Sequence, residues 1–460
     1  MPLKKEEEKE IDLDCDSGEC LQPGDVVSKA AEAKKREEER AGESERVHRD
    51  AFEEPKCFDI LLNYACQAKC QFCSQDFAWR EETNLMPFRQ ACEKIYLAYE
   101  KGYRRLGFTG GEPTLRKDLP KLIAFAKKIG FSYVRIQTNG IRTADFAYTK
   151  ELVDAGLTFV KFSIHGHDHK THDELTMIPG SFQANLDSID HLKRLRVGMG
   201  INIVLNKVNY THLEEFYELF LMKLQLSNFV IIAPLYEGNM NNYVQEMGVR
   251  LSAIAPHVRK AFEMFTKIDF PKPPLLLHFV PCALPGYEQQ MLGWSAFNTT
   301  VVSPSGKLRD LDETVMEHTI KTAECGKCVY NDRCIGFDKS YTNIFGTDEI
   351  APLSEPPKRY DADKPNVDPR TRTVLTDNEL CAIYVLREKD GVTTDEFLEI
   401  SDKFPICKDC KDENAVINAA EMLIKMDRVR REFKKGKYYW YLIKENDTLD
   451  GEHAEAAHHE

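Results

Sequence analysis

Short apolar runs alternate with longer amphipathic stretches between residues 57 and 236. The apolar runs are rich in β-branched and aromatic residues, which is typical of strands buried on both faces of a sheet. They are CFDILLN at 57–63, RRLGFTG at 104–110, YVRIQTNG at 133–140, TFVKFSIHG at 158–166, GMGINIVLNK at 198–207 and NFVIIAPLY at 228–236.

The stretches between these runs carry apolar residues at helical spacing, and several end at glycine, as helices often do. We expect helices at 88–102, 118–130, 145–156, 181–195 and 211–224. Strands and helices in alternation predict an α/β fold with a parallel sheet, either doubly wound or barrel-like. In a barrel, the carboxyl ends of the strands and the loops that follow them carry the chemistry.

The pattern changes on both sides of this region and predicts further segments. The expected order is a charged, disordered segment at 1–55, the sheet-forming core at 56–270, a cysteine-rich extension at 271–350, a proline-rich linker at 351–372, a small domain at 373–446 and an acidic, disordered tail at 447–460. In the small domain, three helical stretches precede a basic hairpin, an order that is typical of a winged helix.

Composition and charge narrow the class of protein. An apolar content of 42% over 460 residues supports a substantial core and excludes a fibrous or fully disordered chain. No apolar run is long enough to span a membrane, and the N-terminus lacks the apolar stretch of a secretory signal, so we expect a soluble, cytoplasmic protein. Residues 1–55 and 445–460 carry −8 and −6 of the net charge of −13, which leaves the middle of the chain nearly neutral.

Cys66, Cys70 and Cys73 follow the first predicted strand directly. The chain has fourteen cysteines, and in a reducing cytoplasm clustered thiols bind metal or do chemistry more often than they form disulfides. Zinc usually takes four ligands arranged as two pairs. Three thiolates on one short loop instead match three irons of a 4Fe–4S cluster and leave the fourth iron open to a small molecule. A zinc site or a structural thiol cluster is the alternative.

With this loop and the elements around it, residues 57–240 resemble the radical SAM superfamily, whose loop motif is C-x3-C-x2-C. Phe72 supplies the aromatic residue before the last cysteine, and TGGEP at 109–113 matches the glycine-rich element that meets the amino group of S-adenosylmethionine. The motif follows the first strand, as in the family. The resemblance implies a partial (β/α)6 TIM-like barrel.

The resemblance also implies a set of site residues. Cys66, Cys70 and Cys73 would hold the catalytic 4Fe–4S cluster; apart from the resemblance, His165 is expected in the substrate pocket because it is the histidine nearest the end of its strand. The residues expected to bind S-adenosylmethionine are Phe72, Gly110, Gly111, Glu112, Pro113, Asn139, Ser163 and Asn202, with Asn206 as the alternative to Asn202 and IIAP at 231–234 along the adenine.

The family's chemistry is then expected of this chain. The reduced cluster cleaves S-adenosylmethionine to methionine and a 5′-deoxyadenosyl radical, which abstracts a hydrogen atom from the substrate. The protein orients the cofactor and excludes water. Such an enzyme needs an external electron donor of the flavodoxin or ferredoxin type.

The histidine-rich loop at 165–173 has two interpretations. His165, His167, His169 and His172 lie close in sequence to two aspartates, Asp168 and Asp173, which could indicate a second metal. No pair of them is set at helical spacing on a firm helix. We therefore favour substrate binding or helix capping over a metal site.

A second cysteine set lies in the extension. Cys325, Cys328 and Cys334 form C-x2-C-x5-C, and Cys282 lies upstream. Four thiolates saturate a second 4Fe–4S cluster or a tetrahedral zinc. The arrangement resembles the auxiliary-cluster extensions called twitch and SPASM, but Asp338 stands where a full SPASM domain has a further cysteine. One auxiliary cluster, suited to oxidation, is expected, with zinc as the alternative.

The remaining cysteines are expected to pack or to form isolated pairs. Cys15 and Cys20 indicate chance or a loose ligand pair, and Cys407 and Cys410 form a pair without partners. The expected packing residues are Cys57, Cys92 and Cys381.

The basic hairpin near the C-terminus has eight Lys or Arg against two acidic residues at 425–444, with aromatic residues at 438–441. It could bind a peptide as an added strand or contact phosphates and bases, or its alternate aromatics could simply be core.

The sequence therefore predicts a radical SAM oxidoreductase that oxidises or cross-links a peptide or protein. The alternatives are a small molecule, a cofactor precursor or a nucleic acid as substrate and, in another class, an iron–sulfur DNA-binding regulator.

Overall fold

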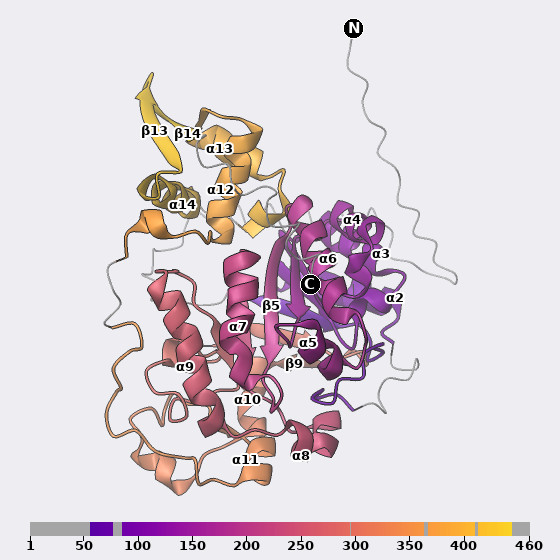
Figure 1. Cartoon of the computed structure of the whole chain (residues 1–460). Coiled ribbons are helices and arrows are strands. Elements are labelled where there is room, and N and C mark those ends of the chain that lie inside the picture. Colours follow the sequence, from indigo (N-terminus) through magenta and orange to yellow (C-terminus); the bar gives the residue numbers. More distant parts are fainter. Residues whose placement is uncertain (1–55, 77–84, 295, 363–366, 410–412, 444–460) are drawn as a thin grey trace. The chain divides into compact units, whose positions relative to one another are not determined.

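A computed structural model describes residues 56–76, 85–294, 296–362, 367–409 and 413–443 (Figure 1). The charged segment expected at 1–55, the tail expected at 447–460, and Cys15, Cys20 and Cys410 lie outside the described residues. None of the helices in the described part of the chain combines the length and the apolar character that crossing a bilayer requires.

A parallel sheet organises residues 57–277, and its strands pair in chain order from β1 to β7. The strands are β1 (Cys57–Leu61), β2 (Arg105–Thr109), β3 (Tyr133–Thr138), β4 (Phe159–Ser163), β5 (Gly198–Val204), β6 (Phe229–Ile232) and β7 (Leu275–Leu277). Strands added in one direction produce the curled half-barrel of a partial TIM barrel. The first six strands lie where the apolar runs predicted them.

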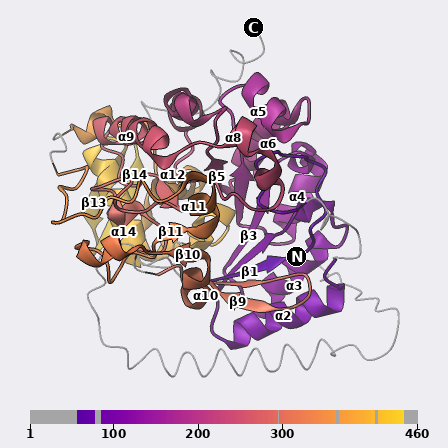
Figure 2. The ribbon, with the colours of Figure 1, turned by 90° about the horizontal axis from the view of Figure 1, so that it is seen from below.

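Helices cover the outer face of this sheet, as the view from below shows for α2, α3 and α4 (Figure 2). The helices of this region are α2 (Phe88–Glu100), α3 (Leu119–Ile129), α4 (Phe146–Asp154), α5 (His169–Thr176), α6 (Ser181–Arg194), α7 (Leu213–Tyr217), α8 (Val244–Met247) and α9 (Leu251–Lys267). In α6, Phe182, Ile189 and Leu192 are buried at helical spacing, so one stripe of the helix faces the sheet. A π-helix, η6 (Glu218–Lys223), continues α7.

The segment at 271–350 adds to the sheet at both of its edges, which the sequence did not predict. β7 pairs with β6, while β8 (Thr299–Val302) runs parallel to β1 and β9 (Leu308–Asp310) pairs antiparallel with β8. The predicted six strands are thus extended, because the edges of β1 and β6 offer unpaired backbone groups that these short strands satisfy. The extension continues with α10 (Leu311–His318), β10 (Thr319–Ile320), β11 (Phe337–Asp338) and α11 (Lys339–Phe345).

Residues 372–443 form their own core around three helices and a small sheet. The elements are α12 (Asp377–Glu388), β12 (Val392–Thr393), α13 (Thr394–Ser401), α14 (Glu413–Lys425), β13 (Val429–Lys434) and β14 (Lys437–Leu442). The strand order is β12-β14-β13, and both pairings are antiparallel. Arg372, at the end of the expected linker, is buried and pairs with Glu379 of α12.

A disulfide between Cys381 and Cys407 lies inside this core. This corrects two predictions: disulfides were not expected in the chain, and Cys407 was paired in sequence with Cys410. Both bonded cysteines are buried, so Cys381 is a core residue as expected. The sequence could not reveal the pairing because the two cysteines belong to different elements, α12 and the turn before α14.

Candidate functional site

The first cysteine loop follows β1 at the carboxyl end of the sheet. Cys66, Cys70 and Cys73 are each half-buried, and the backbone N–H of Cys73 donates to the carbonyl of Cys70 at 3.2 Å. The loop is thus folded back on itself at the edge of the sheet where parallel strands place their functional residues.

Glycines let the TGGEP segment lie directly against the start of this loop. The N–H of Gly111 donates to Asn63 and that of Glu112 to Ala65, at 2.8 and 2.7 Å. A Cβ on Gly110 would lie 2.3 Å from the carbonyl oxygen of Asn63, and Gly110 has a φ of +140°. Only glycine accommodates this approach and this backbone conformation.

The carboxylate of Glu112 is buried and fastens TGGEP to the next strand end. It accepts hydrogen bonds from the N–H and hydroxyl of Thr114, the hydroxyl of Thr138 and the N–H of Asn139, at 2.6–3.0 Å. Burial raises the pKa of Glu112, and these hydrogen bonds partly offset that shift. The side chain therefore orients neighbouring backbone, and Pro113 opens the short helical turn after it.

Asn139, at the end of β3, reaches the cysteine loop itself. Its Nδ2 lies 3.8 Å from the sulfur of Cys66, and its Oδ1 accepts from Gln67 at 3.3 Å. If the Cys66 sulfur ligates a metal, this amide is placed as a second-layer partner of the centre.

Several buried amide oxygens among the described residues have no hydrogen-bond partner. Four of them belong to Asn63, Gln67, Asn185 and Asn202. Ser163 and Asn202 pair in register on β4 and β5. Asn206 instead accepts from the N–H of Val208 and donates to the carbonyl of Val204. Unpartnered acceptors suit a ligand that brings N–H donors.

His165 and Phe72 lie against each other beside the cysteine loop, with ring centroids 4.5 Å apart. Both are buried. The Nδ1 atom of His165 accepts from the N–H of Val204 at 3.2 Å, and burial, together with the neighbouring His172, holds the pKa of His165 well below its usual range. His165 is therefore neutral at neutral pH and offers its other nitrogen as a hydrogen-bond donor.

The acidic residues of the histidine-rich loop cap helices. Asp168 accepts from the N–H of Thr171 as the N-cap of α5, and Asp173 accepts from Gly180, Ser181 and Phe182 before and within α6. His172 is buried, and burial lowers its pKa to about 4. These contacts favour the capping interpretation for the two aspartates.

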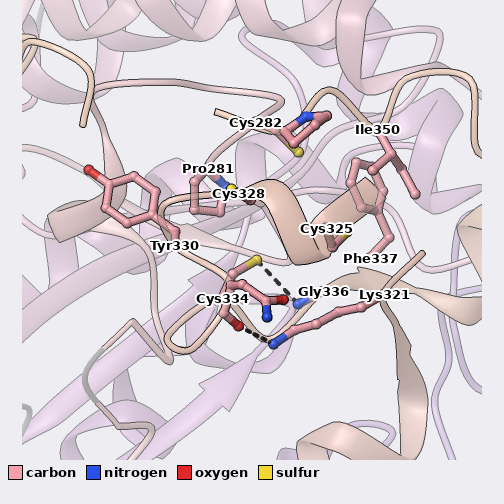
Figure 3. Close-up of a pocket in the computed structure, with 12 residues that line it drawn as sticks. Pro281, Cys282, Lys321, Cys325, Cys328, Tyr330, Cys334, Gly336, Phe337 and Ile350 are labelled. Atoms are coloured by element: carbon pink, nitrogen blue, oxygen red, sulfur yellow. Dashed lines mark hydrogen bonds between the residues drawn. The ribbon is translucent and has the colours of Figure 1, made fainter. Parts of the chain in front are cut away.

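The second set of cysteines comes together in the structure. Cys282, Cys325, Cys328 and Cys334 line one pocket, and their thiols point toward the space between them (Figure 3). Burial, reinforced more weakly by the other three thiols, raises the pKa of Cys282 to about 11, and burial raises that of Cys334. A bound metal would favour the thiolate forms.

The β10–β11 pair closes the loop that carries three of these cysteines. Thr319 pairs with Asp338 and Ile320 with Phe337. Within the loop, the N–H of Gly336 donates to the sulfur of Cys334 at 3.3 Å. Asp338 caps α11 by accepting from Ser340 and Tyr341, so the position that departs from the full SPASM pattern begins a helix.

The donor sets fit iron–sulfur clusters by their chemistry: three thiols on one loop, and four around one pocket. In the described residues, no group of three or more histidine, cysteine or acidic side chains is gathered closely enough to hold a single metal ion. Cys57 and Cys92 lie apart from both sets, and burial raises the pKa of each to about 12.

Sequence reasoning missed the residues that hold the first loop from outside. Asn239 and Met240, in η7 (Gly238–Tyr243) after β6, hydrogen-bond to its backbone, and Gln75 donates to the carbonyl of Gly110. The available signal was a polar GNMNN stretch directly after a buried strand.

Residues 60–220 match the family model described as Radical SAM superfamily. The chain therefore contains a radical SAM superfamily domain, which runs from the end of β1 into η6 and includes the first cysteine loop.

Solved structures that match parts of this chain include SuiB of Streptococcus suis bound to the precursor peptide SuiA. It is 14% identical, covers 74% of this chain and 88% of its own, and has a TM-score of 0.48. Native anSMEcpe with bound AdoMet is 17% identical, with coverages of 67% and 95% and a TM-score of 0.47. TYW1 with a lysine-pyruvate adduct bound is 18% identical, with coverages of 46% and 73% and a TM-score of 0.32. At these values the likeness carries no argument about substrate.

Proposed function

We propose that this chain is a radical SAM enzyme whose Cys66, Cys70 and Cys73 hold a 4Fe–4S cluster beside a site for S-adenosylmethionine. The observation that carries the proposal is the placement of the three thiols. They lie on one loop at the carboxyl end of a parallel half-barrel, inside the segment that matches the radical SAM family. Such an end of a sheet is where this fold places its chemistry.

The chain's own residues would position the cofactor. Gly110 and Gly111 let the TGGEP backbone lie directly against the start of the loop, and the buried oxygen of Asn202 offers an acceptor opposite Ser163. Phe72 supplies an apolar ring, which His165 fixes from its edge. Together, a 4Fe–4S cluster and S-adenosylmethionine supply one-electron chemistry that leads to abstraction of a hydrogen atom from a substrate. An external donor of the flavodoxin or ferredoxin type would deliver the electron.

The proposal includes a second 4Fe–4S cluster at Cys282, Cys325, Cys328 and Cys334, consistent with a twitch-like extension. Its support is that four thiols from two segments line one pocket. Four protein ligands leave no open coordination position, which suits an electron acceptor better than a substrate site. An oxidation in which the substrate radical passes an electron to this cluster would make the enzyme an oxidoreductase. Zinc at the same thiols is the competing assignment, and it would require them to move closer together, because no such group among the described residues is gathered closely enough to hold a single ion.

Anaerobic reconstitution tests both clusters. The protein is loaded with iron and sulfide, iron is counted per chain, and dithionite and S-adenosylmethionine are added. We expect about eight irons per chain and formation of 5′-deoxyadenosine by mass spectrometry. Cys92→Ala, which removes a thiol from α2 outside both sets, is the matched control and should leave both results unchanged. About four irons with product would assign the second set to zinc or to no metal.

A peptide or protein is the substrate class that we propose. The topology α12-β12-α13-α14-β13-β14 with sheet order β12-β14-β13 supports a winged helix at residues 373–446. β13 is one of the two edge strands of the described sheet, and its side chains are mostly exposed. An extended peptide could add to such a strand through main-chain hydrogen bonds. Lys and Arg residues around the hairpin would favour an acidic peptide.

A nucleic acid is the second candidate partner, and one observation favours it. Phe433 and Tyr438 contact each other near the tip of the hairpin, with centroids 5.0 Å apart and ring planes tilted by 60°, and they are 65% and 47% exposed. Arg431 lies over Tyr438. Exposed rings beside cations can stack on bases. Trp440, by contrast, is core, and its Nε1 donates to Thr394.

Fluorescence anisotropy separates the two partners. A labelled extended peptide of alternating Glu and Val should bind, and a single-stranded oligonucleotide of equal charge should bind more weakly. Tighter binding of the oligonucleotide that is lost in Phe433→Ala/Tyr438→Ala would reverse the assignment. It would also favour a DNA-binding regulator if no 5′-deoxyadenosine formed.

A further inference from the structure

The turn of residues 236–240, which we call the β6 turn, contacts the first cysteine loop along its second half. The N–H of Asn239 donates to the carbonyl of Gln75 at 3.3 Å, and the N–H of Met240 donates to that of Cys73 at 3.0 Å. The side-chain Nδ2 of Asn239 donates to the carbonyls of Cys70 and Gln71, at 3.0 and 3.4 Å. The β6 turn thus donates hydrogen bonds to backbone carbonyls spread over residues 70–75 of the first cysteine loop.

The contact between the β6 turn and the loop is close and buried. Asn239 is 4% exposed and Met240 is fully buried. A Cβ on Gly238 would lie 2.3 Å from the carbonyl oxygen of Ser74, and Gly238 has a φ of +55°. A buried amide whose donor meets two carbonyls is costly to remove, because those carbonyls would lose their partner away from water.

The other end of the β6 turn is fastened to the extension that carries the second cysteine set. The N–H of Tyr236 donates to the hydroxyl of Ser340 at 3.0 Å. The ring of Tyr236 packs against Phe345, with centroids 5.2 Å apart. Both partners belong to α11, which directly follows β11 and the cysteine-bearing loop. The β6 turn therefore contacts both the first cysteine loop and α11, the helix that follows the loop of the second cysteine set.

We propose that Asn239 is a positioning residue for the first cysteine loop, and that the β6 turn transmits the placement of α11 to that loop. This inference rests on the proposed function, because it concerns the cluster that the loop would hold. By fixing the carbonyls of Cys70 and Gln71, the Asn239 amide sets the direction from which the Cys70 thiol leaves the backbone, while the N–H of Met240 holds the carbonyl of Cys73. Partners of this kind tune metal affinity and reduction potential without touching the metal.

The test compares Asn239→Ala and Asn239→Asp with Asn241→Ala, an exposed amide on the same helical turn. In the iron-free chain, hydrogen exchange is followed in peptides that cover residues 66–76. We expect exchange there to rise about tenfold in both Asn239 variants, with the strands β3 and β4 unchanged as the internal standard for folding. Asn239→Asp should be the more severe, because its carboxylate faces the carbonyls of Cys70 and Gln71.

The second measurement uses reconstituted chains that also carry Cys328→Ala, so that the first cluster dominates the signal. We expect Asn239→Ala to retain iron about 10–100-fold less tightly and to shift the reduction potential of the cluster. Ser340→Ala should produce a smaller shift in the same direction. The inference is overturned if both Asn239 variants match Asn241→Ala in exchange and in potential. Failure of the unsubstituted chain to bind iron would refute the proposed function instead, while the exchange result would still decide the role of Asn239 in the loop.

Discussion

The two sets of cysteines are built by different means. The first takes its three thiols from one short loop, backed by the ends of β1, β2 and β3 and by the β6 turn. The second joins Cys282, which follows β7, to three cysteines of a loop closed by two-residue strands. Local spacing thus defines the first set, whereas the second depends on closing a long stretch of chain. We expect the first set to hold its iron more firmly than the second set.

The largest effect should follow Cys70→Ala. It removes one of three ligands from the first set, and an iron–sulfur cluster with two protein ligands no longer presents a single open iron. We expect 5′-deoxyadenosine formation to fall by about 10³-fold or more, and iron to fall from about eight to about four per chain. Product formed at the unsubstituted rate would show that the cofactor is bound elsewhere.

Cys328→Ala should separate the two sets. It removes a ligand from the second pocket, so iron should again fall to about four per chain, but cleavage of S-adenosylmethionine should persist. Iron counting and 5′-deoxyadenosine measured on the same sample make the comparison. Unchanged iron content would mean that the second pocket holds no iron.

The same contrast explains what the sequence could predict. The strands β1–β6 are apolar runs buried on both faces, and the three cysteines of the first loop lie close together in sequence. The six strands and the first cysteine set could therefore be predicted from the sequence. Strands β7, β8 and β9 are only three or four residues long, and the sequence around them shows no regular apolar pattern. Their pairing depends on the sheet edges at β6 and β1, which the sequence does not reveal. The contact of Asn239 with Cys70 spans 169 positions. The Cys381–Cys407 disulfide likewise depends on tertiary placement.

A smaller effect on the first set should follow Glu112→Gln. The buried carboxylate binds its proton more tightly in the folded than in the unfolded chain, because burial raises its pKa above 4.5. The folded state therefore binds more protons, and stability falls as pH rises from about 4.5 through the raised pKa. Glu112→Gln should remove this part of the pH dependence. At neutral pH the substitution should lower the free energy of unfolding by about 1–3 kcal/mol. The amide N–H group of the glutamine would face the N–H and O–H donors that the carboxylate now binds.

Urea unfolding of the iron-free chain at several pH values measures that prediction. Thr143→Val is a suitable comparison, since Thr143 is buried and hydrogen-bonded nearby but its hydroxyl bonds Gly140 and Ser188, not Glu112. Its unfolding should keep the pH dependence of the unsubstituted chain. An unchanged pH slope in Glu112→Gln would show that Glu112 is not the group responsible.

The smallest effect should be confined to the second set and should follow Gly336→Ala. Gly336 has a φ of +91°, and a Cβ there would lie 2.5 Å from the carbonyl oxygen of Ile320, which belongs to β10. The left-handed backbone alone costs an alanine about 1–2 kcal/mol, and relieving the contact must move β10 away from β11. Because that pair closes the loop of Cys325, Cys328 and Cys334, we expect iron in the second pocket to be lost about tenfold more readily to a chelator.

Gly326→Ala supplies the matched control for this prediction. Gly326 lies in the same loop, but a Cβ there would meet no atom within 4 Å, and Gly326 is not among the glycines with positive φ. Chelator-driven iron loss should therefore match that of the unsubstituted chain. If Gly336→Ala released iron from the first set as readily as from the second, the difference in robustness between the two sets would be refuted. A loss limited to the second set would show that closing its loop, rather than ligand count, limits how firmly its iron is held.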